Sequence, residues 1–275
     1  QMMNVVVVGG GPTGVEVAGA LAELRNHILP KDHPNLDFGQ MNIHLVEGTG
    51  RLLNGMSDKS GDEALRYLQS MGVDVKLNTL VQDYSQGKVS LGEEKIKTDT
   101  LIWAAGVKGR ILEGIDAGKV VRDRIVTNEF SQVEGLENVF AIGDVAMMKT
   151  DENPNGFPML APVAIQQGEH LGKNFKRLLE GKELKKFNYL DKGTMATIGR
   201  NKAVVDMPGK LHFKGFFAWL IWMFVHIMYL IGFRNKLITL NNWIWSYFTY
   251  DKGTSLIIRT FALSSKKRLA ASRES

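Results

Sequence analysis

Apolar and polar residues alternate in a regular order through the first fifty positions of the chain. Val5–Val8 is an unbroken β-branched run, which predicts a strand buried on both faces. Val15–Ala22 predicts a helix, and Asn42–Val46 predicts a second strand. Pro30–Gln40 is rich in Pro, Asp and Gly and is predicted to be a loop. Strand, helix and strand in this order predict a βαβ unit.

The same alternation continues through residue 106. Ser and Asp favour helix starts and Gly favours helix ends, so these residues mark the boundaries of further elements. Four elements are predicted on this basis: a helix capped by Ser57 or Asp58 and running through Ser70, a strand over Val73–Leu77 after Gly72, a hairpin across Lys88–Lys97, and a buried strand over Thr100–Gly106 that ends in small residues. The whole segment is therefore predicted to be an α/β domain.

The last third of the chain has a different pattern. Gly215–Phe233 is an apolar, aromatic run of nineteen residues whose single titratable group is His226. Its length reaches the threshold for a transmembrane helix, and a buried core helix is the alternative. Within such a run, His226 is predicted to be a hydrogen-bonded structural imidazole.

The next stretch, Arg234–Asp251, predicts an amphipathic helix lying in a membrane surface. One face carries Leu237, Leu240, Ile244 and Phe248, while Lys236, Thr239, Asn242, Ser246 and Thr249 fall largely elsewhere. Aromatic residues suited to a headgroup interface are Trp243, Trp245, Tyr247 and Tyr250.

Charge is distributed unevenly along the chain. The net charge is +5, yet residues 210–275 carry ten Lys and Arg against two acids, so the remaining residues are slightly acidic. A basic, apolar tail favours an anionic membrane surface as partner. Nucleic acid is disfavoured because the basic residues lie beside an aromatic run and not along a polar helix.

Composition excludes several other kinds of site. The 275 residues allow one or two domains, and 44% hydrophobic residues with 7 prolines indicate a folded protein. The chain has no Cys, which excludes disulfides, thiolate metal sites and catalytic thiols within it. The six His have no ligand spacing, so no metal site is predicted.

A glycine-rich loop joins the first predicted strand to the first predicted helix. Its sequence is Gly9-Gly10-Gly11-Pro12-Thr13-Gly14, the G-x-G-x-x-G pattern in the strand–loop–helix context of a dinucleotide site. Gly9 permits the tight turn, Gly11 lets a pyrophosphate approach the backbone, and Gly14 lets helix and strand pack closely. The helix N-terminus would then offer its N–H groups to the phosphates.

Glu47 ends the second predicted strand, where an acid accepts hydrogen bonds from the ribose hydroxyls of NAD(H). Its charge would repel a 2′-phosphate, which disfavours NADP(H). Arg51, four residues further on, favours the opposite preference. The alternative for Glu47 is a solvated residue at a strand end.

Several segments together resemble the type II NADH:quinone oxidoreductases, single-subunit flavoenzymes of the membrane surface. The resemblance covers almost the whole chain. The segments that carry it are GGGPTGVE at Gly9–Glu16, WAAGV at Trp103–Val107, NVFAIGD at Asn138–Asp144, APVAIQQG at Ala161–Gly168, KGTMATIGR at Lys192–Arg200 and LIGFRNK at Leu230–Lys236.

The resemblance implies an α/β two-dinucleotide-binding flavoprotein fold of the glutathione-reductase type, with an amphipathic helical membrane anchor at the carboxyl end. The implied domains are an NADH-binding domain at 1–110, the carboxyl-terminal part of an FAD domain at 111–182 and a membrane-associating domain at 183–275. In this family the NADH domain is inserted into an FAD domain that begins the chain. Because this sequence starts at the inserted domain, we expect an amino-terminally truncated piece that binds NADH, holds FAD poorly and is inactive alone.

The resemblance also implies the chemistry: hydride passes from NADH to FAD, and two electrons pass from FAD to a membrane quinone. Implied catalytic residues are Glu16, Gln166 and Lys192. Glu16 could instead be favoured by the helix dipole, Gln166 could be an ordinary surface amide, and Lys192 is a lone lysine before a glycine. Pro162 replaces the first glutamine of the family's quinone-site helix. Implied cofactor contacts beyond the glycine loop and Glu47 are Ala105, Gly106, Gly143, Asp144, Ala161, Pro162 and Val163.

The implied location is peripheral and monotopic, on the cytoplasmic face of the cell inner membrane, with Lys266, Lys267, Arg268 and Arg273 on anionic lipids. The implied partners are a membrane quinone and an anionic lipid surface, and a homodimer is compatible with the resemblance. Two alternatives stay open: a non-catalytic membrane-bound NADH-binding scaffold or sensor, and another two-dinucleotide flavoprotein reductase.

Overall fold

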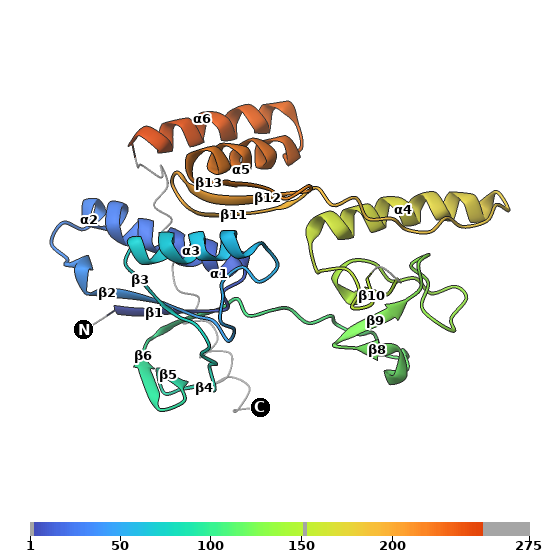
Figure 1. Ribbon diagram of the computed structural model, residues 1–275, viewed down its shortest axis with the longest axis horizontal. Coiled ribbons are helices and arrows are strands. Elements are labelled where there is room, and N and C mark those ends of the chain that lie inside the picture. The colour runs from blue at the N-terminus through green and yellow to red at the C-terminus, as the bar shows by residue number, and fades with distance from the viewer. Residues whose placement is uncertain (1–2, 151–152, 250–275) are drawn as a thin grey trace, which may run out of the picture.

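The computed structural model describes residues 3–150 and 153–249. Its first part, residues 3–106, is built on a parallel sheet of four strands in the order β3-β2-β1-β7. These strands are β1 (Met3–Val8), β2 (Met41–Val46), β3 (Val73–Lys76) and β7 (Thr100–Trp103). Figure 1 shows the helices α1 (Pro12–Glu23) and α3 (Asp58–Ser70) together on one side of this sheet. We call this part the β1 lobe.

A small antiparallel sheet covers the other face of the β1 lobe. It consists of β4 (Asp83–Ser85), β5 (Lys88–Leu91) and β6 (Glu94–Lys97). Its buried Val89 and Ile96 pack against Val6 and Val8 of β1. Both faces of β1 are therefore covered, as its unbroken apolar run predicts.

The predicted helix start and stop in this lobe are confirmed. Ser57 is the N-cap of α3, and its hydroxyl accepts a hydrogen bond from the Ser60 N–H at 3.3 Å. Gly72 follows the helix with φ of +78°, in the left-handed region that glycine adopts without strain. The predicted hairpin is also present as β5 and β6.

Two predictions in the β1 lobe are wrong. Pro30–Gln40 is not all loop, because α1 continues through a π-turn (Leu24–Ile28) into α2 (Leu29–Asp32), and Phe38–Gln40 forms a 3-10 turn. Phe38 is buried there, which holds the segment against the lobe. The strand over Thr100–Gly106 stops at Trp103 and is not buried, because β7 is an edge strand and Trp103 is 59% exposed.

Residues 107–190 form a second part, which we call the α4 lobe. Its short sheet has the order β10-β9-β8, from β8 (Val120–Val121), β9 (Arg124–Thr127) and β10 (Ala146–Met148). The long helix α4 (Ala161–Leu179) lies beside this sheet, and Figure 1 shows the lobe set to one side of the β1 lobe. Its apolar interior consists of two small clusters, centred on Ile125 and on Phe157.

The third part, residues 191–249, we call the carboxyl-terminal unit. The strands β11 (Thr194–Gly199), β12 (Lys202–Met207) and β13 (Leu211–Lys214) form an antiparallel sheet. Two helices follow, α5 (Gly215–Tyr229) and α6 (Phe233–Thr249). Figure 1 shows this sheet between α5 and the helices of the β1 lobe.

The carboxyl-terminal unit shares a hydrophobic core with the β1 lobe. Ala196 and Ile198 of β11 belong to the same buried cluster as Val15 and Ala18 of α1. The two backbones approach closely at Gly19, where an added Cβ would lie 1.7 Å from the Ile198 carbonyl oxygen. A glycine is therefore required at this crossing.

The apolar run at Gly215–Phe233 is not one helix, which argues against the transmembrane alternative. α5 ends at Tyr229, Leu230 is extended (φ −65°, ψ 137°), and α6 begins at Phe233. The 15 residues of α5 give a length of about 22 Å, whereas a bilayer core is about 30 Å thick. Within residues 3–150 and 153–249, no helix has both the length and the apolar character needed to span a membrane.

Candidate functional site

A cavity of about 490 Å³ opens beyond the carboxyl ends of β1, β2 and β7. Parallel α/β sheets place ligands at this edge. Glycine-loop residues Gly9 and Gly11, Glu47 and the segment Trp103–Gly106 line it. The predicted contacts Ala105 and Gly106 therefore lie in its wall.

The three motif glycines of the loop, Gly9, Gly11 and Gly14, differ in how much space surrounds them. Gly9 has φ of +107°, and a Cβ there would lie 2.7 Å from the Ala104 carbonyl oxygen. A Cβ on Gly14 would lie 1.7 Å from the Gly9 carbonyl oxygen, whereas a Cβ on Gly11 would meet nothing within 4 Å. Gly9 and Gly14 are thus required by packing, and Gly11 leaves open space beside the cavity.

The N-terminus of α1 points at this loop without a side-chain cap. Gly11 is the extended N-cap residue, and it has no side chain that could accept from the first-turn N–H groups. Pro12 and Thr13, which begin the helix, are both exposed. An uncapped helix start beside a cavity is a ready anion site, because unpaired N–H groups and the helix dipole both favour negative charge.

Glu47 is held rigidly at the end of β2. Its Oε2 accepts from the Gly10 N–H, and its Oε1 accepts from the Thr49 N–H at 2.8 Å and the Thr49 hydroxyl at 2.7 Å. These bonds tie the acid to the glycine loop, so its carboxylate is preorganised in the cavity wall. The sequence prediction placed Glu47 here but did not identify Thr49.

A second cavity, of about 320 Å³, lies between α1, β11, α5 and α6. Glu16, Ala20 and Glu23 line one side of it from successive turns of α1. Aromatic and basic residues line the rest, chiefly Trp219, Trp222, Trp243, Tyr247 and Arg200. Sequence reasoning missed this cavity, although the i, i+4, i+7 spacing of the three α1 residues places them on one helical face.

Glu16 is half-buried at one end of this cavity. A carboxylate oxygen accepts from the Thr197 N–H of β11 at 3.2 Å. Burial raises the pKa of Glu16, while the Thr197 hydrogen bond and nearby His226 act in the opposite direction and only partly offset it. A carboxyl group with a raised pKa in an apolar setting is a common feature of proton-transfer sites.

Trp243 and Tyr247 of α6 are half-buried, and each contacts an aromatic residue of α5. Trp243 stacks on Trp222 with ring centroids 5.6 Å apart, and Tyr247 contacts Trp219 at 5.4 Å. His226 is hydrogen-bonded as predicted, since its Nδ1 lies 2.8 Å from the Trp222 carbonyl oxygen. The predicted interface residue Tyr250 lies outside the described residues.

The other two predicted catalytic residues occupy different surroundings. The Gln166 side chain on α4 donates to the Leu190 carbonyl at 3.0 Å and accepts from the Leu190 N–H at 2.9 Å. Lys192 is exposed on the segment that leads into β11. Gln166 is hydrogen-bonded to Leu190 and Glu16 to Thr197, so the segment that contains Lys192 joins the surroundings of all three residues. Between Leu190 and Thr197 this segment can span at most about 23 Å.

The predicted flavin-binding turn lies in the α4 lobe. Gly143 has φ of +69° and its N–H donates to the Gln167 amide oxygen at 2.7 Å. Gln167 is 2% exposed, whereas Asp144 is exposed on the turn. Sequence reasoning missed Gln167, although its spacing from the buried Val163 marks it as a core-facing position of α4.

The start of α4 holds the remaining predicted cofactor contacts. Ala161 is exposed and Pro162 is half-buried, while Val163 is 3% exposed and packs with Phe157 and Met148. The side chain of Val163 is therefore committed to the core. The prediction for Val163 can concern only its backbone.

Comparison with known proteins identifies two matching families along the chain. Residues 1–168 match the pyridine nucleotide-disulphide oxidoreductases, and residues 192–249 match the NDH2 C-terminal domain. Among solved structures, the NDH2 from Plasmodium falciparum in complex with NADH superposes with a TM-score of 0.80 at 21% identity, covering 90% of this chain and 66% of that one. A ferredoxin reductase from Rhodopseudomonas palustris gives a TM-score of 0.56 at 14% identity, covering 75% of this chain and 48% of that one. The expected two-dinucleotide fold is thus confirmed.

Three curated relatives share the description type II NADH:quinone oxidoreductase. The type II NADH:quinone oxidoreductase Ndh of Mycobacterium tuberculosis is 33% identical, over 98% of this chain and 60% of its own length. The NdhA of the same organism is 34% identical, over 94% of this chain and 56% of its own length. A Staphylococcus aureus relative is 32% identical, over 76% of this chain and 52% of its own length. The chain spans about 60% of the first of these relatives, and it belongs to the pyridine nucleotide-disulphide oxidoreductase family.

Proposed function

We propose that the protein containing this chain is a non-proton-pumping NADH dehydrogenase that passes a hydride from NADH to FAD and two electrons on to a membrane quinone. The observation that carries the proposal is the glycine-loop cavity with Glu47 in its wall, in a chain whose residues 192–249 match the NDH2 C-terminal domain. The names of the curated relatives and of the NADH-bound Plasmodium structure support it.

The β1 lobe supplies the NADH site in this proposal. The Thr13 and Gly14 N–H groups at the start of α1, next to Pro12, face the pyrophosphate, and Gly11 leaves room for its approach. Glu47 accepts a hydrogen bond from a ribose hydroxyl. Ala105 and Gly106 present a surface without long side chains to the nicotinamide ring.

The α4 lobe supplies part of the FAD site. Asp144 is exposed on a turn that Gln167 holds in place, so its carboxylate is free to accept hydrogen bonds from the ribityl chain. Gly143, Ala161, Pro162 and Val163 bring backbone close to the same region. When bound, FAD accepts the hydride and delivers electrons singly or in pairs to the quinone.

For the quinone we propose an approach through the aromatic cavity that contains Glu16. Quinone reduction consumes two protons, and a half-buried carboxyl with a raised pKa holds one at neutral pH more readily than an exposed one. Gln166 would serve as a hydrogen-bond donor to a quinone carbonyl only after releasing Leu190. Lys192, being exposed, is available to neutralise developing negative charge.

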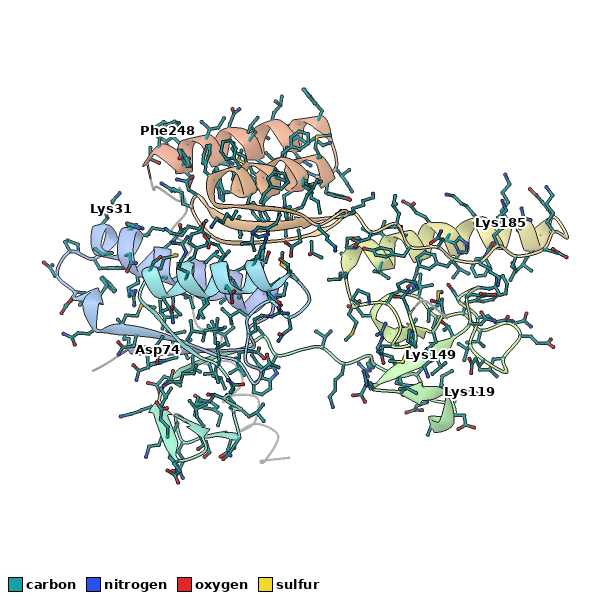
Figure 2. All side chains as sticks on the ribbon, in the orientation of Figure 1. Lys31, Asp74, Lys119, Lys149, Lys185 and Phe248 are labelled. Carbon is teal, nitrogen blue, oxygen red and sulfur yellow. The ribbon has the colours of Figure 1, made fainter. Side chains whose placement is uncertain are left out.

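The carboxyl-terminal unit is proposed to rest on the membrane. Its exposed apolar residues include Phe224, Ile231, Phe233, Trp245 and Phe248, and Figure 2 shows Phe248 near the end of α6. Arg234 lies beside them, so an anionic lipid surface matches the patch. We place the protein as a peripheral enzyme on the cytoplasmic face of the cell inner membrane, with a homodimer as its assembly. The proposed lipid contacts Lys266, Lys267, Arg268 and Arg273 lie outside the described residues.

The proposal is tested on the full-length protein that contains this chain, loaded with FAD. Stopped-flow absorbance separates flavin bleaching by NADH from flavin reoxidation by a quinone. Glu16→Gln should slow reoxidation and leave bleaching unchanged, whereas the control Glu23→Gln, in the same cavity, should alter neither. A protein that binds NADH and FAD in membranes yet transfers no electrons to quinone would favour the scaffold or sensor alternative and overturn the proposal.

A further inference from the structure

The loop after β2 carries two opposite charges and directs them to opposite sides. Glu47 lines the glycine-loop cavity, whereas Arg51 is absent from its lining. The Arg51 guanidinium instead forms an ion pair with Asp58, the first residue of α3. It also approaches the Asn54 and Met56 carbonyls at 3.4 and 3.5 Å.

The stem of Arg51 is held in place as well as its charge. A Cβ on Gly61 of α3 would lie 2.9 Å from Arg51 Cγ, so the aliphatic stem lies directly over this glycine. The side chain is only 29% exposed. Arg51 therefore runs along α3, away from the site where a 2′-phosphate of a dinucleotide would lie.

Thr49 completes the arrangement on the cavity side. Its hydroxyl donates to Glu47 Oε1 at 2.7 Å and accepts from the Asn54 amide at 2.5 Å. A carboxylate has about four acceptor positions, and Gly10 and Thr49 occupy three of those on Glu47. One acceptor position is left. It can accept a hydrogen bond from a ribose hydroxyl, but it offers no donor and no positive charge to a phosphate.

We propose that Asp58 is a positioning residue for nucleotide specificity: it keeps Arg51 out of the dinucleotide cavity, so that discrimination against a 2′-phosphate depends on Asp58 as well as on Glu47. The inference rests on the proposed NADH site. A guanidinium that reached the cavity could bind a 2′-phosphate through two charge-assisted hydrogen bonds. Removing the Glu47 charge alone therefore leaves the cavity without a phosphate partner.

The test is a fluorescence titration of the whole 275-residue chain with NADH and with NADPH at low salt. Glu47→Gln should weaken NADH binding and improve NADPH binding little. Adding Asp58→Asn removes the charged partner of Arg51 and should tighten NADPH binding by about tenfold over Glu47→Gln alone, as one charge-assisted phosphate contact would. Adding Asp62→Asn instead, which removes an exposed acid from the same helix, should give no such gain. Adding Arg51→Ala to the Glu47→Gln/Asp58→Asn pair should abolish it.

Three outcomes would overturn the inference. Glu47→Gln alone could bind NADPH as tightly as the double variant, or the Asp62→Asn control could reproduce the gain, or the gain could survive Arg51→Ala. Thermal melting and retained NADH binding exclude misfolding as the cause of a lost gain. If the unmodified chain binds neither nucleotide, the proposed NADH site fails and the inference fails with it; if it binds NADH and Asp58→Asn has no effect, only the inference fails.

Discussion

The β1 lobe and the α4 lobe differ in whether their buried polar atoms have hydrogen-bond partners. In the β1 lobe, the buried Thr98 hydroxyl donates to the Asn4 carbonyl at 2.6 Å, and Glu47 accepts three hydrogen bonds. In the α4 lobe, the buried atoms Arg124 Nε, Thr127 Oγ1 and Ser131 Oγ have no hydrogen-bond partner within the part of the chain that the structure describes. The buried polar atoms named in the β1 lobe are therefore paired, whereas those named in the α4 lobe are not.

The apolar contacts differ in the same direction. One large cluster joins the β1 lobe to the carboxyl-terminal unit, whereas the described residues of the α4 lobe form two clusters of four buried residues each. Leaving a buried polar group unpaired costs about 1–3 kcal/mol. We therefore expect the α4 lobe to be the less stable of the two, held largely by side-chain hydrogen bonds such as Gln167 to Gly143.

The largest expected effect comes from breaking the β1 lobe at its tightest point. Gly14→Ala would force a Cβ to within 1.7 Å of the Gly9 carbonyl oxygen, and neither group can move away cheaply. We expect a loss of about 4–5 kcal/mol in the free energy of unfolding, and loss of NADH binding with it. Urea denaturation followed by circular dichroism measures the first quantity.

Gly11→Ala is the matched control for Gly14→Ala. Gly11 has φ of −71° and open space around it, so alanine fits without strain. Stability should change by less than about 0.5 kcal/mol, while NADH binding should weaken because the new methyl group occupies the phosphate approach. Equal destabilisation by both variants would contradict this account of the glycine loop.

The next effect compares the two cores directly. Leu45→Ala removes a fully buried side chain from the large cluster, and we expect a cost of about 3–4 kcal/mol. Ile125→Ala removes a side chain from one of the small clusters of the α4 lobe, where we expect about 2 kcal/mol. Hydrogen exchange should locate the first loss across the β1 lobe and the second within the α4 lobe alone. A uniform loss of protection in both variants would mean that the lobes unfold as one unit.

Local signals explain what could be predicted from the sequence. The strand at Val5–Val8, the Ser57 cap and the turn at Gly72 each depend on a few neighbouring residues, and all three are confirmed. The glycine loop follows β1 and Glu47 follows β2. Because these neighbouring strands are parallel, the loop and Glu47 lie together at one edge of the sheet. The roles of the predicted site residues remain proposals.

Contacts between distant segments explain what was missed. The close approach of Gly19 to Ile198 and the facing of Trp243 on Trp222 each join residues from separate elements, and no local pattern encodes them. Two missed features carried a usable signal: Gln167, through its helical spacing from Val163, and the α1 side of the aromatic cavity, through the shared helical face of Glu16, Ala20 and Glu23.

A smaller effect is expected at the seam between the β1 lobe and the carboxyl-terminal unit. Asp206 of β12 accepts hydrogen bonds from the Ser57 N–H at 2.7 Å, the Ser57 and Ser60 hydroxyls at 2.9 and 3.0 Å, and His212 Nδ1 at 2.9 Å. Asp206→Asn should cost about 2 kcal/mol at pH 7, because hydrogen bonds to a charged group are the stronger ones. Asp191 is an exposed acid that lines a cavity of about 550 Å³ together with Asp206, and Asp191→Asn is the control that should be neutral.

The stabilisation by Asp206 should decrease in acid. Burial acts to raise its pKa, but the hydrogen bonds from Ser57, His212 and Ser60 outweigh burial and lower it below the usual 3.8. The stabilisation is therefore present above pH 3.8 and is lost as the pH falls below that value. The difference between Asp206→Asn and the unmodified chain should shrink in acid; a difference that stays constant from pH 7 to pH 3 would contradict the role of the charge.

The smallest effect, at Glu16, should have the opposite pH dependence. Burial raises the pKa of Glu16 above the usual 4.5, so the folded state binds a proton more tightly than the unfolded state. Its contribution to stability is then fully present below pH 4.5 and is lost as the pH rises through the folded-state pKa. Glu16→Gln keeps an acceptor for the Thr197 N–H but carries no charge, so it should raise the melting temperature slightly at pH 7 and leave it unchanged at pH 4. Glu23 lies on the same face of α1, so Glu23→Gln controls for the loss of an acid from this helix. A Glu16→Gln variant that melts lower than the unmodified chain at pH 7 would mean that the carboxylate stabilises the fold, and that its cavity is more polar than its aromatic lining implies.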